Sequence, residues 1–397
     1  MTHPAAGTTE AAAVPHLGVT TPNEITRGRL SRFHPRPTLL WTLIWFALIR
    51  FATVLMVFGF RPVGRDLLND HGDIAWYVSI AEHGYRLAEV VGQTHITSNM
   101  AFFPLTPTLM KPLMLLGVPA LWAGLVVSSA ASIVAAWALY RIGDHLYGQR
   151  VGCCLALSWG CFLPTSIALS LPLSEAVFTA GAAWTCYFLL TDRMIAAAGM
   201  TVLAGLSRPS AIALLAAVVW VAVSKLIKRQ EVWRSIAAIA VAPVGLAGYF
   251  LYVTARTGSW NGYSAIQRTY DSQLDFGAYW IHKISAWFQN PPTNPVDLVA
   301  ISTAVVALAL LALLFVKRVP APLVVYAVAA LLLIVIQSGH IDVLQRFIVP
   351  IFPLLIPVAI GLAKLRWWLL APIVVAMTYL TANYGAFLLY VTRRNII

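Results

Sequence analysis

Apolar runs of close to twenty residues alternate with short polar segments along most of the chain. One such run is long enough for an α-helix to cross a bilayer, and in lipid only helices and closed barrels satisfy their backbone hydrogen bonds. We therefore predict an all-α polytopic membrane protein with about 11 transmembrane helices. The clearest expected spans are 39–60, 119–141, 151–170, 235–255, 298–316, 321–337, 344–363 and 367–390.

The first long polar stretch, 61–118, is expected to form an acidic outer loop. Within it, apolar residues recur at helical spacing, and Gly84 is a natural end for the helix. These residues are Ile74, Tyr77, Val78, Ala81 and Tyr85. The spacing predicts a short amphipathic helix on the outer membrane surface. A second long outer loop is expected at 256–297.

Basic residues predict the orientation of the chain in the membrane. The segment 1–38 is rich in Ala, Thr, Pro and Gly and ends in an arginine-rich collar, so we expect a disordered, basic cytoplasmic tail. The cluster from Lys225 to Arg229 falls on a turn expected on the same side. No long polar segment separates the spans that follow the tail, so 39–397 is expected to form a single transmembrane domain.

The composition excludes several classes of protein. Only 11% of the residues are charged, far below the roughly 25% of a soluble domain. The formal net charge of +12 suits anionic headgroups, and no basic face is interleaved with aromatics, so we expect no nucleic-acid partner. The four cysteines lie in apolar runs without ligand spacing, so neither disulfides nor a zinc site are predicted.

Two blocks of the first outer loop carry a specific pattern: residues 72–85 read GDIAWYVSIAEHGY, and residues 102–107 read FFPLTP. The pattern resembles the PIG-V-type mannosyltransferases, which belong to the GT-C superfamily of membrane glycosyltransferases. Such families often have an aromatic residue before the aspartate, whereas this chain has Gly72. Later blocks fit in the same order, so that the resemblance spans most of 40–365; they are Leu173 to Phe178, Ser207 to Ser210, Gly258 to Gln267 and Gln345 to Pro353.

The resemblance implies a GT-C-like bundle that transfers a hexose, usually mannose, from a polyprenyl-phosphate sugar. The acceptor would be a glycolipid or lipoglycan on the extracytoplasmic face, so that the partners are the donor, the acceptor and membrane lipids. The alternative is a lipid-linked sugar flippase or transporter without catalysis. Asp, Trp, Tyr and Arg gather on one side of the membrane, which favours an enzyme because a transporter needs polar groups accessible from both sides.

Asp73 is the expected catalytic residue. An inverting transfer needs a general base that takes the proton of the acceptor hydroxyl, and one carboxylate suffices because the departing lipid phosphate is a good leaving group. A helix N-cap is the other role that fits its position, and the family resemblance favours catalysis. Glu82 lies nine positions further on, which places it on another helical face, so we do not expect a second acid or base there.

Three residues are expected to bind the donor phosphate. Arg346 begins an otherwise apolar run, where a charge is costly and usually functional, and a guanidinium is a natural partner for phosphate. His340 lies six residues earlier on the same predicted outer turn, and Arg268 lies in the second outer loop. Snorkelling to headgroups is the alternative for Arg346. Arg208, between two apolar segments, has capping of a broken helix as its simplest role.

The sugar and acceptor pocket is expected to be aromatic. Trp76 and Tyr77 follow Asp73 by three and four residues, so the three share a helical face. Their rings suit stacking on a sugar, although aromatics also anchor proteins at the membrane interface. The other expected members of the pocket are Phe103, Pro104, Glu175 and Gln267.

We predict no metal ligands and no cofactor, with a divalent ion as the alternative. No Asp-x-Asp sequence occurs, and the pair Ser174 and Glu175 supplies only one carboxylate. Hard cations need several oxygen ligands. Loss of activity in EDTA would contradict this expectation.

Overall fold

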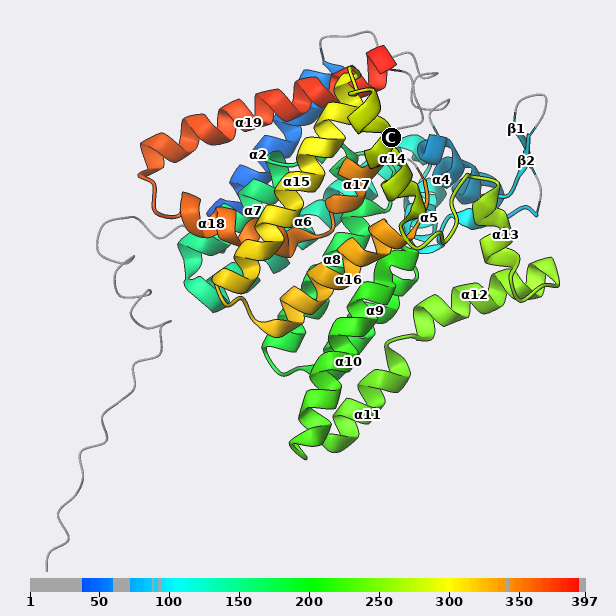
Figure 1. Ribbon diagram of the computed structural model, residues 1–397, viewed down its shortest axis with the longest axis horizontal. Helices are drawn as coiled ribbons and strands as arrows, with labels where there is room; N and C mark the ends of the chain where they lie inside the picture. The colour runs from blue at the N-terminus through cyan, green and yellow to red at the C-terminus, as the bar shows by residue number, and fades with distance from the viewer. Residues whose placement is uncertain (1–37, 60–71, 88, 92–94, 340–342, 393–397) are drawn as a thin grey trace, which may run out of the picture.

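The computed structural model describes residues 38–59, 72–87, 89–91, 95–339 and 343–392. Most of these residues belong to helices that run side by side between the lower left and the upper right of the molecule (Figure 1). Predictions for the tail, for the segment 60–71 and for His340 fall outside the described residues, apart from residue 38.

Helices long and apolar enough to cross a membrane number six among the described residues. They are α2 (Leu39–Phe58), α6 (Ala120–Tyr147), Pro209–Ile227 with α10 (Ile212–Ile227), Val232–Thr257, α15 (Pro295–Val316) and Trp367–Val391 with α19 (Trp367–Phe387). Shorter apolar helices are α8 (Glu175–Leu190), α9 (Met194–Gly205), α16 (Ala321–Ile336) and Phe352–Leu362. Together with α7 (Gln149–Cys161), they supply a helix for each predicted span, so the all-α polytopic prediction is confirmed.

Small residues let α6 and α7 approach closely beside the turn that joins them. Gly143 of α6 faces Gly152 of α7, and a Cβ on Gly143 would lie 2.6 Å from the Cα of Gly152. Between membrane helices, such contacts stabilise through van der Waals packing because lipid gives no hydrophobic drive for association. The four cysteines are buried in apolar surroundings as free thiols, where they act as small apolar residues.

Proline breaks several of the predicted spans. The expected span 235–255 consists of α11 (Val232–Val241) and α12 (Val244–Thr257), which join at Pro243. Proline lacks an amide donor and clashes with the preceding helical turn, so the helix is interrupted there. The expected span 344–363 is likewise divided into α17 (Leu344–Ile348), η5 (Phe352–Leu355) and α18 (Ile356–Leu362).

The helix predicted between Ile74 and Tyr85 is present in the structure. α4 (Gly72–His83) ends at Gly84, whose φ of +79° is the left-handed conformation that glycine adopts readily. The amide of Gly84 donates to the carbonyl of Ile80 at 2.9 Å. A small antiparallel hairpin, β1 (Glu89–Val91) and β2 (His95–Thr97), follows and was not predicted.

The described parts of the two long polar segments, 61–118 and 256–297, meet at one end of the bundle. α5 (Leu105–Leu115), α13 (Gly262–Arg268) and α14 (Ala278–Gln289) gather near α4 at the upper right, and the turn between α10 and α11 lies at the opposite end (Figure 1). At that opposite end Lys225 forms ion pairs with Asp192 at 2.8 Å and with Glu231 at 2.7 Å. Lys225 and its partners are thus separated from α4 by the length of the bundle (Figure 1).

Candidate active site

Four charged side chains from four separate segments meet at the end of the bundle that carries α4. The guanidinium of Arg346 contacts Asp73 through Nη2 and donates from Nε to Oε1 of Glu175 at 2.5 Å. Arg208 donates from Nη1 to the same oxygen of Glu175, also at 2.5 Å. We refer to Asp73, Glu175, Arg208 and Arg346 as the ion-pair cluster.

Exposure rises steadily across the ion-pair cluster. The Glu175 side chain has no exposed surface, Arg346 is 6% exposed and Arg208 is 11% exposed. Asp73 is 32% exposed, so it is the member that an arriving molecule can reach most easily. The two carboxylates that contact Arg346 balance its positive charge in this mostly buried place.

Local sequence places Asp73 at the open edge of the cluster. It lies in the first turn of α4, where an acidic side chain interacts favourably with the helix dipole. Gly72 precedes it with a φ of +40°, on the left-handed side that bulky residues rarely adopt. This backbone conformation explains why the chain has glycine where the resembling family often has an aromatic residue. Because α4 begins at Gly72, Asp73 lies inside the helix and not at the N-cap.

Arg208 reaches the cluster from a helix break. It is extended, with φ −156° and ψ 150°, and it precedes the short η3 turn (Pro209–Ala211) between α9 and α10. Proline disfavours the helical conformation of the residue before it, so Pro209 causes this break. The Arg208 guanidinium also lies over the ring of Phe347, 5.5 Å from its centroid, which brings it beside Arg346.

Aromatic rings form a wall beside Asp73. Trp76 stacks on Phe102 with centroids 6.0 Å apart and meets Tyr270 edge-on at 6.2 Å. Tyr77 packs edge-on against Phe102 at 5.4 Å. Trp76 keeps part of its surface exposed, as a ring that contacts a sugar must, whereas Tyr77 is buried.

Tyr77 supports the cluster from below α4. Its hydroxyl forms a hydrogen bond with Ser174, the neighbour of Glu175. Burial raises the pKa of this hydroxyl above its usual range, although the hydrogen bond acts in the opposite direction. The hydroxyl is therefore protonated at neutral pH, and Tyr77 connects α4 to the start of α8.

The remaining predicted site residues lie around the ion-pair cluster and not in it. Phe103 is 1% exposed and packs on Tyr249 with centroids 4.3 Å apart, and Pro104 directly precedes α5. Gln267 donates to the hydroxyl of Tyr263 at 2.7 Å. These contacts make Phe103 and Gln267 parts of an aromatic core between the segment before α5 and the helices α12 and α13.

Arg268 is exposed on α13 and lines a hollow of about 330 Å³ together with Trp260 and Tyr263. The residues that line this hollow include no member of the ion-pair cluster. Arg268 thus lies beside a different surface from Arg346, although both were expected to bind the donor phosphate. His340 lies outside the described residues.

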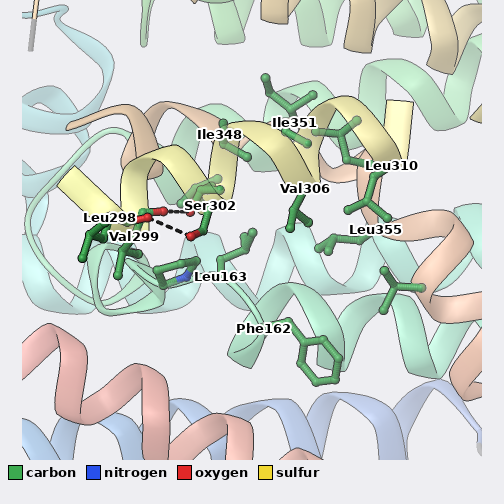
Figure 2. A pocket seen from close by; sticks show the side chains of 16 residues that line it. Phe162, Leu163, Leu298, Val299, Ser302, Val306, Leu310, Ile348, Ile351 and Leu355 are labelled. Atoms are coloured by element: carbon green, nitrogen blue, oxygen red, sulfur yellow. Dashed lines mark hydrogen bonds between the residues drawn. The ribbon is translucent and has the colours of Figure 1, made fainter. Parts of the chain in front are cut away.

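An apolar groove of about 380 Å³ is lined in part by residues that follow Arg346 in the sequence (Figure 2). Its walls are α15, the turn 162–164 and the segment from Ile348 to Val358, and Ile348 is two residues from Arg346. The hydroxyls of Ser302 and Thr303 point to carbonyls of their own helix, at 2.8 and 2.6 Å. The groove therefore offers a mostly apolar surface, which suits an alkyl or isoprenoid chain.

The ion-pair cluster is a poor match for a divalent cation. Asp73 and Glu175 both contact Arg346, whose charge would repel a metal ion held between them. Hard cations also need more oxygen ligands than these two carboxylates supply. Within the described part of the chain, no group of three or more His, Cys, Asp or Glu side chains is placed to hold a metal.

Sequence reasoning did not assign Arg208 to the site. The available signal was an arginine beside a proline between two apolar segments, a place where a charge is costly and usually has a partner. The identity of that partner, Glu175, depends on contacts between distant segments.

Comparisons with known proteins establish the fold. No protein-family model and no curated protein matches the chain. The structure is similar to ArnT from Cupriavidus metallidurans bound to undecaprenyl phosphate, with a TM-score of 0.51 and 15% identity over 82% of this chain. The oligosaccharyltransferase of Archaeoglobus fulgidus gives a TM-score of 0.48 and 14% identity, over 87% of this chain and 53% of that one.

The match covers 60% of the ArnT chain. The chain is therefore a multi-pass membrane protein whose fold is similar to that of ArnT. At this level of identity the likeness concerns the fold alone, and membership of the PIG-V-type family stays a prediction.

Proposed function

We propose that the protein is an inverting glycosyltransferase that uses a polyprenyl-phosphate sugar on the extracytoplasmic face. The observation that carries the proposal is the partly exposed Asp73 carboxylate held beside the buried Arg346 guanidinium. A base and a phosphate-binding cation side by side are what this transfer requires. The fold shared with an ArnT bound to undecaprenyl phosphate supports a polyprenyl-phosphate donor.

In the proposed reaction Asp73 takes the proton of an acceptor hydroxyl while that oxygen bonds to the anomeric carbon. The bond from the anomeric carbon to the phosphate oxygen breaks, and its electron pair stays on the departing polyprenyl phosphate. Attack from the face opposite the phosphate inverts the configuration. Arg346 stabilises the negative charge that develops on the phosphate.

The surroundings of Asp73 suit both ends of such a donor. The ring of Trp76, stacked on Phe102, offers a surface for a sugar. The apolar groove that Ile348 helps to line offers a surface for the polyprenyl chain. Mannose as the sugar, and a glycolipid or lipoglycan as the acceptor, rest on the sequence resemblance.

The test is incubation of purified protein with polyprenyl-phosphate mannose and a membrane glycolipid fraction, with free polyprenyl phosphate and mannosylated lipid measured by mass spectrometry. We expect Asp73→Asn to lower the transfer rate about 100-fold or more, because it removes the base. Glu82→Gln, which changes an exposed carboxylate on the same helix, is the matched control and is expected to leave the rate unchanged.

Full activity of Asp73→Asn would rule out Asp73 as the base. Movement of the intact donor from one leaflet of a liposome to the other, without any sugar transfer, would instead support the flippase hypothesis.

A further inference from the structure

Glu175 is the least accessible member of the ion-pair cluster, and it contacts both arginines. Its Oε1 accepts hydrogen bonds from both Arg208 and Arg346, each at 2.5 Å. Its Oε2 is buried, and no described residue donates a hydrogen bond to it. A carboxylate with no exposed surface cannot contact an acceptor hydroxyl unless the surrounding structure opens. What it does in this arrangement is fix two guanidinium groups at one place.

The two guanidinium groups lie together although their positions in the sequence are far apart. Arg346 is on α17, and Arg208 precedes η3 and lies over the ring of Phe347, the next residue after Arg346. Two cations side by side repel each other, and the shared oxygen of Glu175 offsets this repulsion. Paired guanidinium groups present several N–H donors, a pattern that matches the oxygens of a phosphate.

The formal charges of the cluster balance without a ligand. Arg208 and Arg346 carry two positive charges, and Asp73 and Glu175 carry two negative charges. In the proposed reaction Asp73 becomes neutral when it takes the proton of the acceptor. In the same step the lipid phosphate changes from a diester with one negative charge to a monoester with a second one. Arg346 thus loses an anionic partner just as a new anionic partner forms.

We propose that Glu175 is a positioning residue that holds Arg208 and Arg346 as a paired guanidinium site for the lipid phosphate. Arg346 exchanges Asp73 for the phosphate as the base takes the proton, and Arg208 is the second ligand of the phosphate. This inference rests on the proposed function, because it names how the same site binds its donor. Buried ion pairs contribute little net stability, so stability alone is a weak reason for this arrangement.

The experiment measures equilibrium binding of undecaprenyl phosphate to the purified full chain in nanodiscs, with undecaprenol as the probe that lacks phosphate. We expect Arg208→Ala to weaken binding of undecaprenyl phosphate about tenfold or more, because charge-assisted hydrogen bonds are lost. Binding of undecaprenol should not change. Arg193→Ala, at an exposed arginine, is the control and should bind both lipids as the unchanged protein does.

Two further variants separate the inference from simpler explanations. Arg208→Lys keeps the positive charge, so it can be measured if Arg208→Ala does not fold. It should still bind undecaprenyl phosphate more weakly than the unchanged protein, because lysine lacks the planar guanidinium fork. Arg208→Ala combined with Glu175→Gln restores the charge balance without a second guanidinium, so binding should stay weak.

Wild-type affinity in Arg208→Lys or in the double variant would overturn the role of Arg208 as a phosphate ligand. Glu175→Gln alone should lower kcat without raising the donor KM, because both cations remain while their placement is lost. An unchanged kcat would overturn the positioning role.

These measurements and the transferase assay fail independently. Binding is measured without an acceptor, so Arg208-dependent binding without any sugar transfer would contradict only the proposed function. If the protein transfers sugar but Arg208→Ala leaves its affinity for undecaprenyl phosphate unchanged, only this inference is contradicted.

Discussion

Two buried arginines, Arg50 and Arg346, are held in opposite ways. Arg50 of α2 is 5% exposed and donates to neutral groups, the hydroxyl of Ser170 at 2.6 and 3.2 Å and the carbonyl of Gly160 at 3.1 Å. The described residues place no carboxylate in an ion pair with it. Arg346 is equally buried but is held by two carboxylates, one of which reaches the surface.

The difference distinguishes an arginine that holds two segments of the fold together from one that can exchange its hydrogen-bond partners. Gly160 lies in the last turn of α7 and Ser170 lies within the irregular stretch between α7 and α8, so Arg50 ties that stretch to α2. Neutral acceptors do not change charge at physiological pH, so Arg50 keeps the same hydrogen-bond partners throughout. Asp73 does change charge in the proposed reaction, and Arg346 is then free to bind the new anion. The environment of a buried cation thus indicates its role better than its burial.

The largest effect is expected at Arg346. Arg346→Ala removes the cation beside the base and should lower kcat/KM for transfer about 100-fold or more. Arg346→Lys should recover only part of the loss, because lysine lacks the planar fork. Kinetics with polyprenyl-phosphate mannose, on protein shown to be folded by size-exclusion chromatography, check this. Near-normal turnover by Arg346→Ala would mean that Arg346, like Arg50, holds structure together and takes no part in the reaction.

Arg50→Met should act on stability and not on chemistry. It leaves the buried carbonyl of Gly160 without its donor, which costs about 1–3 kcal/mol. Thermal unfolding in detergent should therefore occur at a lower temperature, while transfer per folded molecule stays within about twofold, a change of less than about 0.5 kcal/mol in barrier height. A large loss of turnover in protein of unchanged stability would contradict the fastening role.

Gly72→Ala should have a smaller effect on the Arg346 side of the comparison. A residue with a Cβ at a φ of +40° costs about 1 kcal/mol, because the left-handed region disfavours side chains. The first turn of α4, and with it Asp73, should be less well held against Arg346. A modest fall in transfer rate with an unchanged donor KM is the expected result. If Gly72→Ala raises the unfolding temperature, the conformation assigned to Gly72 is wrong.

The smallest effect is expected at Glu231, at the opposite end of the bundle. Hydrogen bonds from Lys225 and Arg234 lower the pKa of this partly exposed carboxyl. A carboxyl with a lowered pKa in the folded state adds stability above its unfolded pKa and loses it as the pH falls through the folded value. Glu231→Gln should slightly reduce stability near pH 7, and this difference should vanish in acid. Unfolding temperatures across pH 3 to 7 provide the check.

Local patterns account for what the sequence could predict. The apolar runs predicted spans at which the structure has helices, and the spacing from Ile74 to Tyr85 predicted α4 and its end at Gly84. Both features depend on residues within a few helical turns of each other. The same is true of the break at Pro243, whose signal was visible but was read as part of a continuous span.

The pairings within the site could not be predicted in this way. Asp73 and Arg346 are 273 residues apart, and Glu175 is 33 residues from Arg208. No periodicity connects positions at such distances, so the sequence named Arg268, as a weaker candidate, together with Arg346 for the same phosphate, and only the structure shows that the two lie beside different surfaces. The positive φ of Gly72 could not be predicted either. The sequence shows only that an aromatic residue is missing there, and not the backbone conformation that disfavours one.

The balanced charge of the ion-pair cluster also governs how a donor would arrive. A net-neutral group of charges has a short-ranged field, so it does little to draw an anionic lipid from a distance. The donor is therefore expected to reach Arg346 by lateral diffusion within the leaflet, with its polyprenyl chain entering beside Ile348. Turnover should then follow the surface density of the donor in the bilayer and depend only weakly on ionic strength.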